Sequence, residues 1–155
     1  MDDQKKLRKH LMELLEGRSA HVGLDEAIKA FPITKINERV KNSPHTAWEL
    51  LEHIRIAQRD ILEFSRDAEH VSPDWPEGYW NHLQATEKDW KRSVKQVLKD
   101  LESIREMVVN RKSDLFARFP HGTGQTLLRE VLVLADHNAY HLGQLMLIRR
   151  IVEKS

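Results

Sequence analysis

Four long stretches of this chain carry apolar residues at the three- and four-residue spacing of an amphipathic helix, and nothing resembles a strand–loop–strand alternation. They span about residues 2–16, 43–67, 86–110 and 125–153, and a shorter helical pattern covers 24–31. Each long helix must bury its apolar face against the others. The sequence therefore predicts an all-α fold, a four-helix bundle with long ordered loops and a short extra helix.

Local signals mark where these helices begin and end. Ser43 suits an N-cap and Pro44 the first helical position, so the second long helix is expected to begin there. Thr86 with Asp89 has the spacing of a capping box, and Gly17 is a plausible stop for the first helix. The loops that follow the first and second long helices are long enough to cross the bundle from end to end, so patterning alone leaves the topology open.

Composition limits the class of protein. A chain of 155 residues is most simply one domain, residues 1–155. It has no cysteine, which excludes disulfides, thiolate metal sites and a cysteine nucleophile. The net charge of +1 comes from interspersed charges with no basic stripe, so no nucleic-acid partner is expected. No apolar run is long enough to span a membrane and no signal peptide is recognisable, so we expect no membrane partner and a cytoplasmic location.

The last helical stretch contains two histidines four residues apart, His137 and His141. This spacing places both imidazoles on one helix face, one turn apart, among mostly apolar neighbours. Two buried imidazoles side by side either hydrogen-bond to carboxylates or bind a metal, and the spacing alone leaves both open. His53, in the second long helix, is a third candidate ligand. Three histidines without cysteine would leave coordination positions open for water or substrate.

The other histidines are interpreted more plainly. Three fall at polar or loop positions and are expected to be exposed and without function: His10, His70 and His82. His45 could share a helix stripe with His53, but about 12 Å of helix would separate them, too far for one ion. His121, in the loop before the last helix, could line the mouth of a site.

Other side chains could support the site. Glu49, Asp136 and Gln144 lie beside the histidines in the sequence and could orient an imidazole. The segment 72–80 is too rich in turn formers to be helical, and its aromatic residues imply an ordered loop. The shape of a substrate pocket would depend on five aromatic residues: Trp75, Tyr79, Trp80, Phe116 and Phe119.

Three segments together resemble the DinB-like superfamily, also called DinB/YfiT-like metal-dependent enzymes. They are residues 43–54, which end with the first histidine, residues 73–80, and residues 124–144, which contain the histidine pair. The resemblance implies a four-helix bundle of up-down-down-up order. It also implies a divalent metal, nickel or zinc, held by His53, His137 and His141. Some relatives are transferases or isomerases that act with low-molecular-weight thiols, and family members often form dimers.

From the residues and this resemblance, we expect a metal-dependent enzyme that acts on a small molecule. The metal would act as a Lewis acid, in a thiol-dependent transferase or in a hydrolase. Glu49 and His121 are the candidates for a general base. The alternatives are a non-catalytic module that binds a small ligand, or a homodimeric scaffold whose histidines are structural.

Overall fold

The structure is a computed structural model in which residues 3–154 are described. It contains five α-helices: α1 (Asp3–Glu16), α2 (Leu24–Lys29), α3 (Ala47–Arg66), α4 (Glu87–Val109) and α5 (Leu127–Val152). Two short 3₁₀ turns, η1 (Ile33–Lys35) and η2 (Glu77–Tyr79), lie in the connections. No strand forms between residues 3 and 154, so the all-α prediction is confirmed. None of the helices described is both long enough and apolar enough to cross a membrane.

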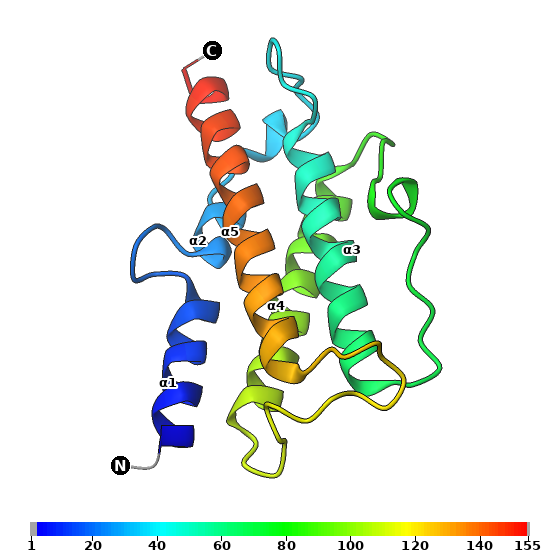
Figure 1. Cartoon of the computed structure of the whole chain (residues 1–155). Coiled ribbons are helices and arrows are strands. Elements are labelled where there is room, and N and C mark those ends of the chain that lie inside the picture. Colours follow the sequence, from blue (N-terminus) through cyan, green and yellow to red (C-terminus); the bar gives the residue numbers. More distant parts are fainter. Residues whose placement is uncertain (1–2, 155) are drawn as a thin grey trace.

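The helices are arranged around the pair α3 and α5. Figure 1 shows these two side by side with α4 behind them, and α3 contacts both α4 and α5. The first helix, α1, packs on α4 and α5, and the short α2 packs on the same two helices. The long connection between α3 and α4 runs back along the outer side of α3 (Figure 1). This arrangement places the middle of α3 opposite the middle of α5.

The interior holds two apolar clusters joined by a polar connection. One cluster is formed mainly by the side chains of α2, α3 and α5, and the other by those of α1, α4 and α5. Gln58 on α3 is fully buried and donates to the carbonyl of Val97 on α4 at 2.7 Å. It also accepts a hydrogen bond from Asn138 on α5 at 3.0 Å. A buried amide that is bonded on both sides fixes the three helices in one register.

The start of α3 differs from the expectation. The predicted N-cap, Ser43, lies in a turn outside the helix, and α3 begins at Ala47 with Thr46 as its N-cap. The Thr46 hydroxyl accepts from the Glu49 amide at 3.2 Å, and the Glu49 carboxylate accepts from the Thr46 amide at 2.7 Å. This reciprocal pair gives hydrogen-bond partners to two backbone amides at the start of the helix, whereas a serine before proline gives a partner to one at most. The stronger signal determines the boundary.

The remaining boundaries agree with the expectation to within two residues, the usual uncertainty of helix ends. The capping box of Thr86 and Asp89 is confirmed at the start of α4, and Gly17 follows α1 with a φ of 65°, which glycine adopts without strain. The first predicted helix included Asp2, which lies outside the described residues. The turn-rich segment 72–80 contains only the three-residue turn η2, so its interpretation as a loop holds.

Candidate metal centre

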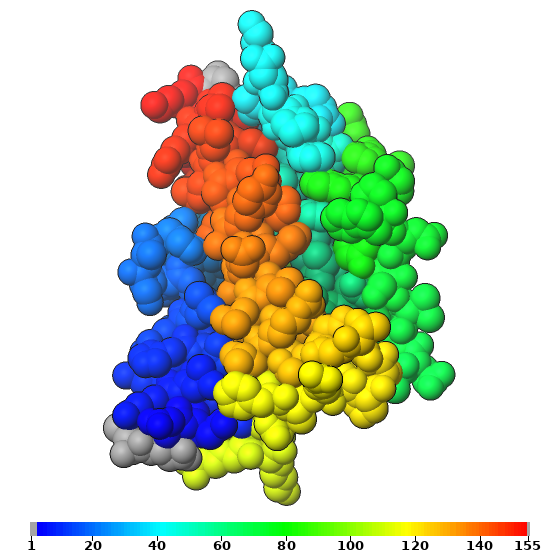
Figure 2. All heavy atoms as spheres, viewed as in Figure 1, coloured from blue at the N-terminus to red at the C-terminus, as the bar shows by residue number. Residues whose placement is uncertain are grey.

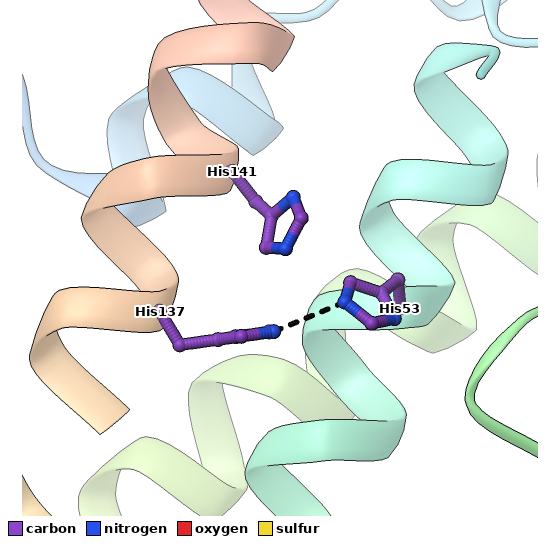
Figure 3. A group of neighbouring side chains, drawn as sticks. All are labelled: His53, His137 and His141. Atoms are coloured by element: carbon purple, nitrogen blue, oxygen red, sulfur yellow. Dashed lines mark hydrogen bonds between the residues drawn. The ribbon is translucent and has the colours of Figure 1, made fainter. Parts of the chain in front are cut away.

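Three histidines from two helices meet in the middle of the bundle. His53 projects from α3, and His137 and His141 project from successive turns of α5, with the three rings turned towards one another (Figure 3). Each ring offers a nitrogen, and these three nitrogens lie within 4.8 Å of one another. The structure therefore brings together all three residues that the sequence singled out. In residues 3–154 no other group of three histidines, aspartates or glutamates lies close enough to hold an ion.

Hydrogen bonds fix the protonation of two of these rings. Nδ1 of His53 lies 2.9 Å from the backbone oxygen of Tyr79, and Nδ1 of His141 lies 2.7 Å from the side-chain oxygen of Gln144. Carbonyl oxygens only accept hydrogen bonds, so each Nδ1 must carry the proton. In the neutral ring Nε2 then presents a lone pair to the centre. Gln144 was a predicted orienting partner, whereas the Tyr79 carbonyl was not foreseen.

The shortest contact in the group joins two ring nitrogens. Nε2 of His53 and Nε2 of His137 are 3.0 Å apart, as the dashed line in Figure 3 marks. Two lone pairs at this distance repel each other unless a proton or a cation lies between them. Two nitrogens at the usual 2.0–2.1 Å from one ion, subtending 90–109°, would be about 2.8–3.4 Å apart. The observed separation falls within that range.

The chemistry of the donors also fits a metal. Nδ1 of His137 is buried without a hydrogen-bond partner in the described structure, so no protein group holds this ring by its outer nitrogen. Neutral imidazole suits zinc, copper, iron and nickel rather than calcium or magnesium. Because the set consists of three neutral nitrogens with no thiolate or carboxylate, it leaves the charge of a divalent ion uncompensated and further coordination positions open.

Burial keeps the three rings neutral. Desolvation lowers the pKa of His53 and of His141, although in each ring the hydrogen bond to Nδ1 opposes the shift. The pKa of His137 falls furthest, to about 4, because of desolvation first and then the neighbouring imidazoles of His141 and His53. A ligand must be deprotonated before it can bind a metal. All three rings meet this condition at neutral pH.

Trp80 forms one wall of the centre. Its indole lies between two imidazoles, with ring centroids 4.0 Å from His53 and 3.9 Å from His45, and the planes are nearly parallel. His45 is thus separated from the centre by the whole thickness of the indole. The expectation that His45 is not a ligand agrees with this placement, but the stack itself had no signal in the sequence.

The centre opens to the surface through a pocket of about 420 Å³. Its lining comprises the three histidines with Ala57, Trp75, Tyr79, Val133, Asp136 and Tyr140. Trp75 is 77% exposed and Tyr140 is 67% exposed, so large aromatic surfaces surround the mouth. Asp136 is exposed and is the one carboxylate in this lining, and no lysine or arginine belongs to it. Of the five aromatic residues expected to shape a pocket, Trp75 and Tyr79 line it directly.

Glu49, a candidate base, is buried at the start of α3 and fully engaged. Besides its capping role, it accepts two hydrogen bonds from Arg39 at 3.0 Å and one from His82 at 2.9 Å. Burial alone would raise the pKa of Glu49, but the hydrogen bonds from His82, Thr46 and Arg39 outweigh it and lower that pKa. No oxygen of this carboxylate faces the pocket lined by the three histidines.

His121, the other candidate base, lies at the opposite end of α3. Its Nε2 is 2.7 Å from the carbonyl oxygen of Phe64, eleven residues beyond His53 and therefore about 16 Å along the helix. Phe119 packs against His121 and Phe64, and Phe116 is largely exposed. None of these residues lines the pocket at the three histidines.

The histidines expected to be exposed behave differently from one another. His10 is exposed, and His82 is mostly exposed although it bonds to Glu49. His70 is not exposed: its side chain is 19% accessible, and Nε2 lies 2.7 Å from Oδ1 of Asp60 on α3. That expectation was wrong because a polar loop residue can be covered when a largely buried carboxylate accepts a hydrogen bond from it.

We predict a specific pH dependence for the metal-free protein. The pKa of His137 is about 4 in the folded chain against an ordinary 6.5, so the unfolded chain takes up its proton first as the pH falls. The free energy of unfolding should therefore decrease as the pH falls from about 6.5 to 4. Below about pH 4 this group should cause no further decrease. Urea unfolding across this range measures it. His137→Gln should flatten the decrease, whereas His10→Gln should not; equal slopes in all three proteins would contradict the assignment.

Comparison with known proteins gives a family. The sequence matches the family model of the DinB superfamily over residues 18–145. No curated protein and no solved structure matched the chain in the other two comparisons. The matched span covers most of the chain and includes all three histidines of the centre, which the structure places around one point. The chain belongs to the DinB superfamily.

Proposed function

We propose that His53, His137 and His141 hold one divalent metal ion, nickel or zinc, and that the protein is a metal-dependent enzyme acting on a small molecule. The observation that carries the proposal is the convergence of three ring nitrogens within 4.8 Å of one another, with Nε2 of His53 and Nε2 of His137 only 3.0 Å apart. Once bound, the ion would supply Lewis acidity at the floor of the pocket. The family match supports the same assignment.

Asp136 is the group that we propose as proton acceptor, in place of Glu49 and His121. Its side chain is exposed in the lining of the same pocket and has no hydrogen-bond or ion-pair partner in the described structure. It can therefore take a proton from a thiol or a water molecule without first losing a partner. Glu49 would have to give up its hydrogen bonds, and His121 is bonded some three turns away along α3.

The lining also limits the substrate. Aromatic and aliphatic side chains form most of the pocket, with one carboxylate and no cationic side chain. This lining best suits a substrate that is neutral or positively charged at the mouth of the pocket. A planar apolar part of the substrate would pack against Trp75 and Tyr140. Both reactions considered, transfer of a low-molecular-weight thiol and hydrolysis, need only a proton acceptor and a Lewis acid. The chain supports each of them equally.

The finer description of the fold is part of the same proposal. We propose one domain over residues 1–155 with an up-down-down-up order of α1, α3, α4 and α5. The direction of the connection between α3 and α4 supports it: Tyr79 bonds Asp60, further along Asn81 bonds Glu52, and then His82 bonds Glu49. The loop thus returns to the N-terminal end of α3 before α4 begins (Figure 1).

The first test is the metal content of the purified, untagged protein, measured by plasma mass spectrometry. We expect about one metal per chain, and its loss in His53→Ala and in His137→Ala while the helical circular dichroism persists. His10→Ala, which removes an exposed histidine of α1, should keep the metal. A protein that stays free of metal after incubation with nickel and zinc would reduce the three histidines to core residues and remove the main support for an enzyme.

Replacing the proposed proton acceptor should slow the reaction without releasing the metal. Asp136→Asn should keep the metal content and lower turnover by about 10²-fold or more, the usual contribution of a general base, and Asp136→Glu should recover part of it. Two probes serve: transfer of cysteine to 1-chloro-2,4-dinitrobenzene and hydrolysis of p-nitrophenyl acetate. An unchanged rate in Asp136→Asn would exclude this residue. Turnover of neither probe by the metal-loaded protein would favour the alternative, a module that binds a small ligand without catalysis.

A homodimer also belongs to the proposal, because α5 carries an apolar face that nothing in the described structure covers. Its exposed side chains outside the pocket lining are Leu132, Leu147 and Ile151, whereas the exposed Val133 and Tyr140 belong to that lining. Figure 2 shows atoms of α5, in orange, as a continuous band between the N-terminal helices and the loop before α4. A second copy would remove the side chains of Leu132, Leu147 and Ile151 from water.

Light scattering on an eluting column peak should give a mass of twice the 18.2 kDa chain. Leu147→Glu should shift the mass to that of one chain, because a buried unpaired carboxylate strongly disfavours the interface. Leu83→Glu is the matched control, since Leu83 is 78% exposed on the loop before α4. A single-chain mass for the unmodified protein at micromolar concentration would refute the dimer.

A further inference from the structure

One carboxylate on α3 holds the loop that covers His53. Asp60 is largely buried, and both of its oxygens bind this loop. Oδ1 lies 2.7 Å from Nε2 of His70, and Oδ2 accepts a hydrogen bond from the phenol of Tyr79 at 2.6 Å. These two loop residues are nine positions apart in the sequence. A single side chain therefore fixes both the outgoing part of the loop and the part next to the metal centre.

Tyr79 connects that carboxylate to the centre. Its side chain reaches Asp60, while its backbone oxygen accepts the Nδ1 proton of His53 at 2.9 Å. Burial first, and then Asp60, raises the pKa of Tyr79 to about 12, so the phenol stays a donor at every ordinary pH. The next residue, Trp80, stacks on the His53 ring with planes 4° apart. Two successive loop residues thus set the tautomer of His53 and the plane of its ring.

Asp60 itself is remote from the proposed ion. It lies seven residues after His53 on the same helix, about 10 Å along the axis, and it does not line the pocket. Between Asp67 and Thr86 the loop has only the short turn η2 as regular structure, so side-chain hydrogen bonds must hold its path. Without the carboxylate, the phenol of Tyr79 and the ring of His70 would lose their common acceptor.

We infer that Asp60 is a positioning residue for the metal centre: through Tyr79 it holds the loop so that His53 keeps its proton on Nδ1 and points Nε2 at the ion. The inference rests on the proposed metal site, but the position of the His53 proton exists without metal. Partners of this kind commonly contribute about 10- to 100-fold to metal affinity.

The test compares three variants of the full chain. Tyr79→Phe removes only the hydroxyl that reaches Asp60 and keeps the ring and the backbone carbonyl. Asp60→Ala removes both loop contacts. Asp74→Ala is the matched control, because Asp74 is exposed on the same loop and its carboxylate has no hydrogen-bond partner in the described structure. Zinc dissociation constants are measured by competition with a chromophoric chelator, and urea unfolding of the metal-free proteins monitors folding.

We expect Tyr79→Phe to weaken zinc binding about tenfold and Asp60→Ala at least as much, with no change in Asp74→Ala. The double variant should bind zinc at most about twofold more weakly than Asp60→Ala alone, because both substitutions act through one hydrogen bond. Equal zinc affinity in Tyr79→Phe, Asp60→Ala and the unmodified protein would overturn the inference. If Asp60→Ala fails to fold, the zinc affinity of Tyr79→Phe alone tests the inference.

A second measurement separates this inference from the proposed function. Nitrogen-15 NMR of the imidazoles in metal-free protein should show His53 protonated at Nδ1, and a mixture of tautomers in Tyr79→Phe. A purely structural role of Tyr79 in the loop would lower stability without changing this tautomer. If the unmodified protein binds neither nickel nor zinc, the proposed function fails, and the tautomer still tests the role of Asp60: an unchanged Nδ1 proton in both variants refutes it.

Discussion

The burial of three neutral imidazoles between α3 and α5 is the constraint on which the rest of the site depends. An imidazole taken out of water needs partners for both nitrogens, and here the outer nitrogens of His53 and His141 have a carbonyl and an amide. The inner nitrogens face one another, where only a proton or a cation is a satisfactory partner. The same desolvation that makes this arrangement costly holds the rings neutral and so keeps them able to bind a metal.

Helix packing supplies the accuracy that such a site requires. The two histidines of α5 keep a fixed spacing because they lie on successive turns, while the third depends on how α3 sits against α5. Gln58, one turn beyond His53, bonds to α4 and α5 in the fully buried interior and so fixes that register. Apolar clusters on both sides limit any sliding of the helices. The site therefore lies between helices whose register is fixed by buried packing and hydrogen bonds.

The sequence was sufficient for the helices and for the pair His137 and His141, because helical period and HxxxH spacing are local properties. His53 was joined to this pair by the resemblance to a family. The sequence failed where two local signals competed, as at Ser43 against Thr46, and only the second belongs to a reciprocal capping box. It also failed where a contact depends on the path of a loop, as with His70 on Asp60 and the indole of Trp80 on His53. The Tyr79 carbonyl had no signal at all, since every residue carries a backbone oxygen.

The loop from Asp67 to Thr86 has a consequence for how proteins of this shape can diversify. It returns along α3, a helix of 20 residues and about 30 Å, held in turn by Asp60, Glu52 and Glu49. A span of about 30 Å needs about nine extended residues, so deletions that left fewer than this would prevent α4 from starting where it does. The same loop supplies Trp75 and Tyr79 to the pocket, so exchanging these two side chains changes the lining without altering the path that carries the chain to α4.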